Sequence, residues 1–452
     1  MKHKIDLIEG DTVRGLLSMV LPLVAAMILT MAYNLVDSLW VGNLLGEAGY
    51  AALTSSTAIV LILSAVAMGC GNGAAILVSQ EVGARRTEEA DRTIATILLL
   101  ACGFALAVTV VLELALDPLL RLLGTPAASC AGAHAYLSVY LIGYPAIFLY
   151  MQITSLFRSF GDPVFQMKGM LFTTVFNAVV DPLMILALGL AGAAWATVLS
   201  EVLCMLYSVW YHRRRRLFRL SLRMAAPALV RPVLRCAVPS AVQQCMPAIS
   251  SAAMLFLLTR YGVTTIAAYG VANRVEILLF YPAMAMNMAL TTIAGQCFGA
   301  ARSDRARAYL RAGLLLGCAA TAVTTALVVG FAGRLSGFFL DSAQAAAIVQ
   351  HFFRIVAIGY VLYMATSCFL GVLSGAGRPG LSMLSFFLYY IVLRIPLAAL
   401  LVRTAMGLDG IWTAILLSHA LAALIAGAFA HGTVGRAGRN GHRKPLAFSR
   451  GT

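Results

Sequence analysis

Long apolar segments, each about the length needed to cross a bilayer, make up most of this chain and narrowly limit its fold. Of its 452 residues, 61% are hydrophobic and only 11% are charged. A soluble domain of this length needs far more polar surface, so the composition indicates a helical membrane protein with many spans. We predict twelve membrane-spanning helices, at residues 15–42, 52–78, 93–115, 131–155, 165–188, 191–211, 236–259, 266–294, 307–331, 345–371, 381–402 and 410–431.

Basic residues are unevenly divided between the connections that join these segments. Most of the 33 Lys and Arg lie at the termini and in one set of alternate connections, whereas the other set holds Arg121, Arg260, Arg334 and Arg403. Connections rich in Lys and Arg stay in the cytoplasm, so we predict a multi-pass plasma-membrane protein with both termini cytoplasmic. The net charge of +15 therefore reflects membrane topology. We expect membrane lipid, and no nucleic acid, as a partner of a monomer.

The two halves of the chain carry the same short motifs at an almost constant separation. Gln-x-x-Gly-Ala begins at Gln80 and recurs 216 residues later at Gln296. Ile-Gly-Tyr begins at Ile142 and recurs at the same separation, at Ile358. Further pairs are Gly161 with Gly377, Pro163 with Pro379, Pro22 with Pro239, Gly189 with Gly407, Gly192 with Gly410 and Ser200 with Ser418. Each half therefore holds six spans, and this even number gives both halves the same orientation.

The repeat predicts the organisation of the whole chain. We expect an all-α integral membrane protein with twelve transmembrane helices in two pseudo-symmetric six-helix lobes around a central cleft. The predicted parts are an N-terminal lobe at 11–212, a basic cytoplasmic linker at 213–232, a C-terminal lobe at 233–432 and a disordered cytoplasmic tail at 433–452.

Polar side chains recur at helical spacing in three spans of the first half. They are Thr30, Tyr33, Asn34 and Asp37 in the first span, Thr173, Asn177 and Asp181 in the fifth, and Thr197 and Glu201 in the sixth. Unpaired polar groups are costly in hydrocarbon, so these faces must turn toward protein or water. The two carboxylates lie at matching depths, and carboxylates within a membrane mark sites that handle a cation or a proton.

Two ions suit this group of side chains. Two carboxylates in a poorly solvated pocket do not both ionise easily, so a proton could bind. Na⁺ could bind instead at Asp37, Asn177, Asp181 and Thr197, because hard cations prefer oxygen ligands. In the alternative interpretation both Asp residues are structural and bond to neighbouring helices, and Thr197 bonds a carbonyl of its own helix.

The chain resembles the multidrug and toxic compound extrusion (MATE) family, a branch of the multidrug/oligosaccharidyl-lipid/polysaccharide exporter superfamily. The resemblance covers essentially the whole chain. The matching segments are Pro22 with Tyr33-Asn34-Leu35-Val36-Asp37-Ser38-Leu39-Trp40-Val41-Gly42, Gln80-Glu81-Val82-Gly83-Ala84, and Phe176-Asn177-Ala178-Val179-Val180-Asp181-Pro182. It implies that Asp37, Asn177 and Asp181 form a polar pocket of the N-terminal lobe, which Thr197 joins.

The resemblance also implies an activity. We expect a secondary antiporter that exports small organic, drug-like molecules in exchange for H⁺ or Na⁺ by alternating access, with the transported ion and no cofactor. Tyr33 is expected to help hold the ion. Pro22 lacks an amide donor and can kink the first helix, so we expect it to act as a hinge.

The second half offers different chemistry. Glu276 lies near the middle of the eighth span, where the repeat places Val60 in the first half. It could contact a cationic substrate, carry a second proton or pair with an Arg. Arg394 lies near the position that corresponds to Asp181, where it could partner a buried acid or favour anionic substrates. We take Glu276, Asn34 and Arg394 as substrate candidates.

Other classes of protein fit less well. The runner-up is a flippase for lipid-linked oligosaccharides or other lipids within the same superfamily. An enzyme would need a cluster of acid, base or metal-binding residues, but the sequence has no HExxH, GxSxG or Asp-rich motif. It also lacks the GxxxxGK[ST] loop of ATPases, and its nine cysteines show no metal-binding spacing.

Overall fold

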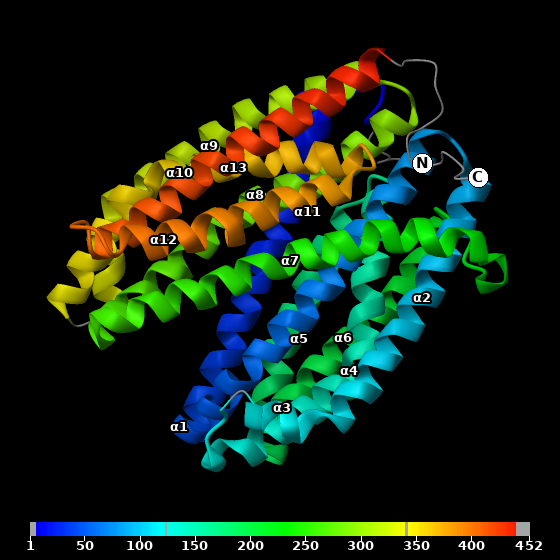
Figure 1. The fold of residues 1–452 in the computed structure, drawn as a ribbon. Coiled ribbons are helices and arrows are strands. Elements are labelled where there is room, and N and C mark those ends of the chain that lie inside the picture. Colours follow the sequence, from blue (N-terminus) through cyan, green and yellow to red (C-terminus); the bar gives the residue numbers. More distant parts are fainter. Residues whose placement is uncertain (1–5, 123, 340–341, 440–452) are drawn as a thin grey trace. The chain divides into compact units, whose positions relative to one another are not determined.

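The computed structural model describes residues 6–122, 124–339 and 342–439, and all regular elements among them are helical. Twelve helices in this part of the chain are long and apolar enough to cross a membrane. The long helices are α1 Thr12–Gly83, α2 Thr87–Leu114, α4 Ala127–Ser159, α5 Val164–Leu188, α6 Leu190–Arg215, α7 Val230–Leu258, α8 Val263–Gly299, α9 Ser303–Phe339, α10 Ala343–Gly375 and α13 Leu408–Arg439. The prediction of an all-helical membrane protein with twelve spans is confirmed (Figure 1).

Shorter elements complete the chain. Helix α11 Pro379–Phe387, the π-helix η4 Leu388–Arg394 and helix α12 Ile395–Leu401 follow one another without a break and together form one span. The remaining elements are α3 Leu116–Leu122 and the 3₁₀ turns η1 Leu222–Met224, η2 Pro227–Leu229 and η3 Thr259–Tyr261. The sequence predicted an ordinary helix at 381–402, so the π-helix is a departure from that expectation.

The first two spans are joined more closely than the sequence predicted. We expected a loop between 15–42 and 52–78, but helical structure runs from Thr12 to Glu47 and from Gly49 to Gly83. The break is at Gly46, whose φ of 65° and ψ of −160° are accessible to glycine and strained for other residues. Gly189, with a φ of 64°, likewise separates α5 from α6.

The described chain forms two compact units, which we call the N-unit and the C-unit. The N-unit comprises Leu21–Val82 and Arg86–Ala237. The C-unit comprises the described residues up to Val20, Gly83–Arg85 and those from Val238 onward. The domain boundaries predicted from the repeat stay a prediction. Helix α13 continues through residues 433–439 of the predicted tail, and residues 440–452 lie outside the described residues.

The beginning of α1 belongs to the C-unit. Its first residues are held by Arg305 of α9, whose guanidinium donates to the carbonyl of Gly10 and to Thr12 Oγ1, the latter at 3.1 Å. Leu16 and Met19, one turn apart on α1, are fully buried. The division between the units falls between Val20 and Leu21, next to the kinking residue Pro22.

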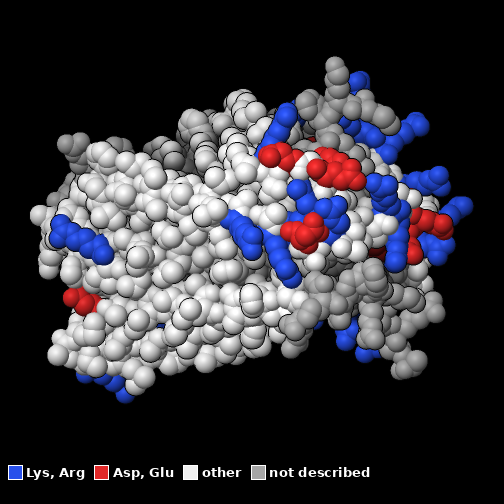
Figure 2. All heavy atoms as spheres, turned by 90° about the horizontal axis from the view of Figure 1, so that it is seen from above, with Lys and Arg blue, Asp and Glu red and all other residues white. Residues whose placement is uncertain are grey.

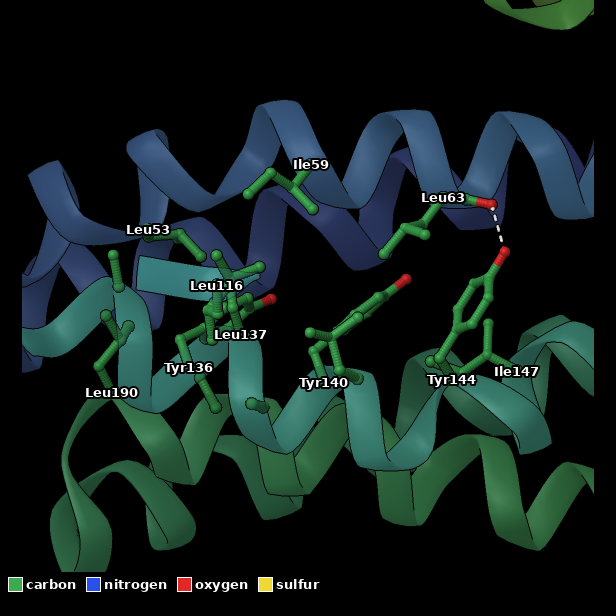
Figure 3. Packing of buried hydrophobic residues seen from close by; sticks show 14 of the residues in the cluster. Leu53, Ile59, Leu63, Leu116, Tyr136, Leu137, Tyr140, Tyr144, Ile147 and Leu190 are labelled. Carbon is green, nitrogen blue, oxygen red and sulfur yellow. Dashed lines mark hydrogen bonds between the residues drawn. The ribbon is translucent and has the colours of Figure 1, made fainter. Parts of the chain in front are cut away.

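Helix α4 carries much of the core of the N-unit. It packs against α2 and α6, while α5 packs against α6. Tyr136, Tyr140 and Tyr144 recur every four residues, so they lie on one side of α4, and all three are buried (Figure 3). The Tyr144 hydroxyl donates to the carbonyl of Leu63 on α1 at 3.1 Å.

Helix α10 has the corresponding place in the C-unit, where it packs against α8, α9 and α13 (Figure 1). Trp412 of α13 is almost fully buried, and its ring lies 4.8 Å from Phe352 of α10 and 5.9 Å from Tyr269 of α8. Outside these cores the surface is largely uncharged. Charged side chains on the face seen in Figure 2 gather in patches and leave wide areas free.

Two repeat-related glycines allow close contact between consecutive helices. A Cβ added at Gly192 of α6 would collide with the carbonyl oxygen of Met184 on α5. A Cβ at Gly410 of α13 would collide with the carbonyl oxygen of Leu401 on α12. Both units therefore use the same contact, a backbone carbonyl against a glycine, to pack the last helix of each repeat.

We expect Gly192→Ala and Gly410→Ala each to lower the thermal unfolding temperature of the detergent-purified protein by several degrees. The added methyl meets rigid backbone, and overpacking of this kind costs about 1–3 kcal/mol. Gly103→Ala is the control, since a Cβ at this glycine of α2 meets nothing within 4 Å. Equal unfolding temperatures for all three variants would contradict this account of the packing.

Candidate functional site

Two buried carboxyl groups face one another inside the N-unit. Asp37 of α1 is 8% exposed and Asp181 of α5 is fully buried. Each of the two carboxyl groups interacts with the other. A carboxylate has no donor, so two carboxyl groups bond to each other only when one of them carries a proton. The pair can therefore hold one proton between two helices.

The same site contains polar atoms that find no donor or acceptor elsewhere in the described protein. Apart from the contact between the two carboxyls, no hydrogen bond reaches Asp37 Oδ1, either oxygen of Asp181, or the amide oxygen and nitrogen of Asn177. Asn177 is fully buried one turn before Asp181 on α5. Buried polar groups are nearly always satisfied in proteins, so these unpaired atoms make the cluster a candidate binding site.

A hydrogen bond between hydroxyl groups links the helices beside the carboxyl pair. Tyr33 of α1 donates its hydroxyl proton to Thr197 Oγ1 of α6 at 2.8 Å. Tyr33 lies one turn before Asp37 and interacts with it electrostatically. Thr173 and Thr30 bond carbonyls of their own helices, whereas the described bond of Thr197 is the one from Tyr33. Thus the structure brings Tyr33 and Thr197 to the site.

Asn34 is placed differently. It shares the predicted polar face of the first span, yet its side chain is exposed. The described contact at this residue is to its backbone, where Ser38 Oγ donates to the Asn34 carbonyl at 2.8 Å. Asn34 is therefore not gathered with the buried carboxyl pair.

Sequence reasoning missed two tyrosines of α4 that surround this site. Tyr136 interacts electrostatically with both Asp37 and Asp181, and Tyr140 does so with Glu201 of α6. The spacing of Tyr136, Tyr140 and Tyr144 at intervals of four was the available signal, because it places three phenols on one face of a helix.

The C-unit contains a second buried carboxyl group in a different setting. Glu276 of α8 is 5% exposed and accepts a hydrogen bond from the Tyr360 hydroxyl of α10 at 2.7 Å. Tyr360 ends the second Ile-Gly-Tyr motif. In the first copy Tyr144 donates to a backbone carbonyl instead. The same repeated tyrosine thus serves packing in one unit and binds a carboxyl in the other.

Arg394, the last residue of the π-helix, is the buried cation of the C-unit, at 8% exposure. Its Nε donates to Ser418 Oγ at 3.0 Å, and its Nη2 donates to the Tyr389 hydroxyl and lies 3.3 Å from His419 Nε2. The guanidinium also lies 4.7 Å and 4.9 Å from the ring centres of Tyr389 and Tyr390. Such stacking stabilises a desolvated cation.

The π-helix explains this arrangement. A π turn contains an extra residue, which changes the side of the helix on which the following residues lie. Here it ends just before Pro396, which has no amide donor for the preceding turn. Glu276 and Arg394 interact electrostatically.

A metal ion at the carboxyl pair would have few acidic, histidine or cysteine side chains as ligands. The described residues include no group of three or more His, Cys, Asp or Glu that could hold a metal ion. A transported cation at the carboxyl pair would therefore have to use amide and hydroxyl oxygens as well, such as those of Asn177 on α5 and Thr197 on α6.

Comparisons with known proteins agree with this architecture. Residues 22–183 and 239–400 each match the model of the MatE family, so the two halves of the chain match separately. The chain is similar to the probable multidrug resistance protein YpnP of Bacillus subtilis, with 26% identity, over 87% of this chain and 89% of the relative. It is 24% identical to the FAD transporter of Shewanella oneidensis, over 88% of this chain and 90% of that protein.

Solved structures share the fold. A multidrug resistance MATE family transporter of the MOP superfamily, in an outward-facing conformation, superposes with a TM-score of 0.91 at 24% identity. The alignment covers 97% of this chain and all of that structure. At this identity the match establishes the fold alone.

Proposed function

Because the chain belongs to the MatE family, we propose that it is a secondary antiporter that exports small organic molecules in exchange for H⁺ or Na⁺. Members of this family are membrane transporters, so the chain is a transporter and not an enzyme. The observation that carries the proposed coupling is the buried pair of Asp37 and Asp181, whose oxygens have no other described partner.

The proposed mechanism is competition between the ion and the substrate, transmitted through the charge of this pair. When the incoming cation or proton binds, it neutralises the carboxyls, and an organic substrate that depends on the charged state is released. Tyr33 lies on the same helix as Asp37 and donates a hydrogen bond to Thr197 of α6. A change of charge at the pair therefore also changes the packing of α1 against α5 and α6. Na⁺ would be bound by Asp37, Asn177, Asp181 and Thr197.

We propose that the ion and the substrate contact different groups. Glu276 and Arg394 of the C-unit, with Asn34 of the N-unit, are the proposed substrate contacts. The relatives include a probable multidrug resistance protein and an FAD transporter, and FAD carries an anionic diphosphate. Arg394 suits an anionic group and Glu276 a cationic one, so the proposed contacts accommodate substrates of either charge.

The proposed location is the plasma membrane, with both termini in the cytoplasm. The support is the concentration of Lys and Arg at the termini and in alternate connections. A protease-accessibility assay on tagged termini in right-side-out vesicles tests this topology, and cleavage of either tag from the outside would contradict it.

We expect Asp37→Asn and Asp181→Asn each to lower gradient-driven transport in proteoliposomes at least about tenfold, because an amide cannot exchange a proton and weakens cation binding. H⁺ and Na⁺ gradients are imposed separately, with ethidium and FAD as probes. The control is Asp409→Asn, since Asp409 is paired with His351 at an exposed position of the C-unit. Wild-type transport by Asp37→Asn, or wild-type insensitivity to both gradients, would overturn the antiport proposal.

We expect Glu276→Gln and Arg394→Lys to change which probe is transported more than which ion drives it. Loss of the buried carboxylate should lower the ethidium-to-FAD transport ratio by about tenfold, since a lost charge pairing costs on this order. The shortened cation of Arg394→Lys loses its stacking on Tyr389 and should raise the ratio. Arg354→Lys, an exposed position on α10, is the control. Unchanged ratios with altered ion dependence would refute this division of roles.

We also propose that Pro22 is a hinge, and that Pro239 is its counterpart. The division between the units falls between Val20 and Leu21 in α1 and between Ala237 and Val238 in α7, so each proline follows a division closely. A helix lacking one backbone hydrogen bond bends more easily at that point.

The hinge proposal predicts that Pro22→Ala and Pro239→Ala slow transport several-fold while leaving probe binding unchanged. Pro282→Ala is the matched control, because Pro282 also lies inside a long helix but away from the divisions. Binding is measured by fluorescence titration of ethidium and transport in proteoliposomes. If the control slows transport as much as Pro22→Ala does, the hinge assignment is wrong.

A further inference from the structure

We propose that Glu201 is a second proton-binding group, which receives the proton from the Asp37–Asp181 pair on its way to the cytoplasm. This inference rests on the proposed antiport and applies to its proton-coupled form. No role in ion coupling followed for Glu201 from the sequence, which placed it one turn beyond Thr197 in the sixth span.

Glu201 is a buried carboxyl group with an unsatisfied oxygen. It lies on α6, is 9% exposed, and its Oε2 has no hydrogen-bond partner among the described residues. An ionisable group placed in this way inside a membrane span is costly to the fold and is therefore expected to serve a function.

Its position links it to the carboxyl pair without making it part of that site. Thr197 precedes it by one turn on α6, and Thr197 Oγ1 accepts the hydrogen bond from Tyr33, which lies one turn from Asp37 on α1. Asp37, Asp181 and Glu201 do not form a three-carboxyl group of the kind that could hold a metal ion. Glu201 is therefore a separate carboxyl group, one helical turn from the Tyr33–Thr197 hydrogen bond.

The groups around Glu201 are uncharged apart from that pair. The titratable groups that interact with it electrostatically are Tyr33 of α1, Tyr140 and Tyr150 of α4, and Cys204 of α6. On α5, which packs against α6, the titratable residues are Asp181 and Lys168, and Lys168 is exposed. None of these described groups is a cation that would hold Glu201 as a carboxylate, so Glu201 can change between its charged and neutral forms.

Polar groups continue from Glu201 toward the basic end of α6. Cys204 follows it by three residues and lies 2.8 Å from Thr173 Oγ1 of α5. The Tyr150 hydroxyl is buried and without a described partner, and a Cβ at Gly169 would collide with it. Helix α6 then ends at His212–Arg215, the part of the chain that we assign to the cytoplasm. Glu201 thus lies between the carboxyl pair and that end of the helix.

The transfer balances without any further reactant. In the proposed transfer the protonated aspartate gives its proton to the Tyr33 oxygen, Tyr33 gives its own proton to Thr197 Oγ1, and Thr197 gives its proton to Glu201. The middle step follows a described hydrogen bond. The first, from Asp37, and the last each join side chains one helical turn apart on the same helix. Each hydroxyl gains one proton and loses one, so it is unchanged at the end. The net result is one O–H bond broken at an aspartate and one formed at Glu201.

The test uses Glu201→Gln in the full-length protein, because glutamine keeps the shape of the side chain but cannot take up a proton. Infrared difference spectra of purified protein between acidic and alkaline pH report protonated carboxyl groups and need no substrate. We expect the variant to lose one carboxyl band that the wild type shows. In proteoliposomes we expect H⁺-driven transport of ethidium or FAD to fall at least about tenfold.

Two further variants make the result specific. Glu113→Gln is the matched control, because Glu113 accepts a hydrogen bond from Ser138 at 2.5 Å and its Oε2 is likewise buried and unpartnered. Glu201→Asp keeps a carboxyl group and should restore part of the H⁺-driven transport. If Glu201→Gln cannot be purified in folded form, Thr197→Val interrupts the same hydroxyl bridge and should slow H⁺-driven transport equally.

The outcomes separate this inference from the antiport proposal. An unchanged infrared spectrum, or wild-type H⁺-driven transport by Glu201→Gln, overturns the role of Glu201 and leaves the carboxyl pair as the coupling site. Transport by the wild type that responds to Na⁺ alone also overturns it. Wild-type indifference to both gradients overturns the antiport, while the infrared band still reports whether Glu201 binds a proton.

Discussion

The contact between the carboxyl groups of Asp37 and Asp181 is the interaction on which the proposed function depends. Both groups are buried, and a hydrogen bond between them needs a proton that neither the backbone nor a neighbouring cation supplies. Removal of this proton leaves two like charges inside a membrane, and an incoming cation must then compensate for them. In the proposed antiport, the energy of the N-unit is therefore tied to the ion that it binds.

The two halves of the chain show how one scaffold carries different chemistry. The contacts between consecutive helices at Gly192 and Gly410 are repeated, as is the tyrosine of the Ile-Gly-Tyr motif. The N-unit nevertheless gathers acidic groups, whereas the C-unit holds Glu276 together with a stacked cation at Arg394. Helix packing thus tolerates a change of side-chain charge where a local partner, or a change in the helix itself, satisfies the new group.

Much of the architecture could be read from the sequence, because hydrophobic length is a strong and local signal. The twelve spans emerged in this way, and helical spacing brought Tyr33, Asp37 and Asp181 toward one site. The exposure of Asn34 could not be predicted from the sequence, because adjacent positions of one polar face are covered by different neighbouring helices. The close joining of the first two spans at Gly46 and the π-helix before Pro396 depend on backbone geometry, for which composition gives little sign.

The opening turns of α1 belong to the C-unit although the chain enters the N-unit directly after them. The two halves of the repeat are therefore not interchangeable modules that could be separated at the basic connection. A fragment ending near Arg215 would carry Leu16 and Met19 without the α9 residue, Arg305, that holds the start of the helix. The complementary fragment would present Arg305 without Gly10 and Thr12. The repeat gives the chain its symmetry, but the start of α1 belongs to the unit that the second half forms, so the two halves cannot be separated at the basic connection.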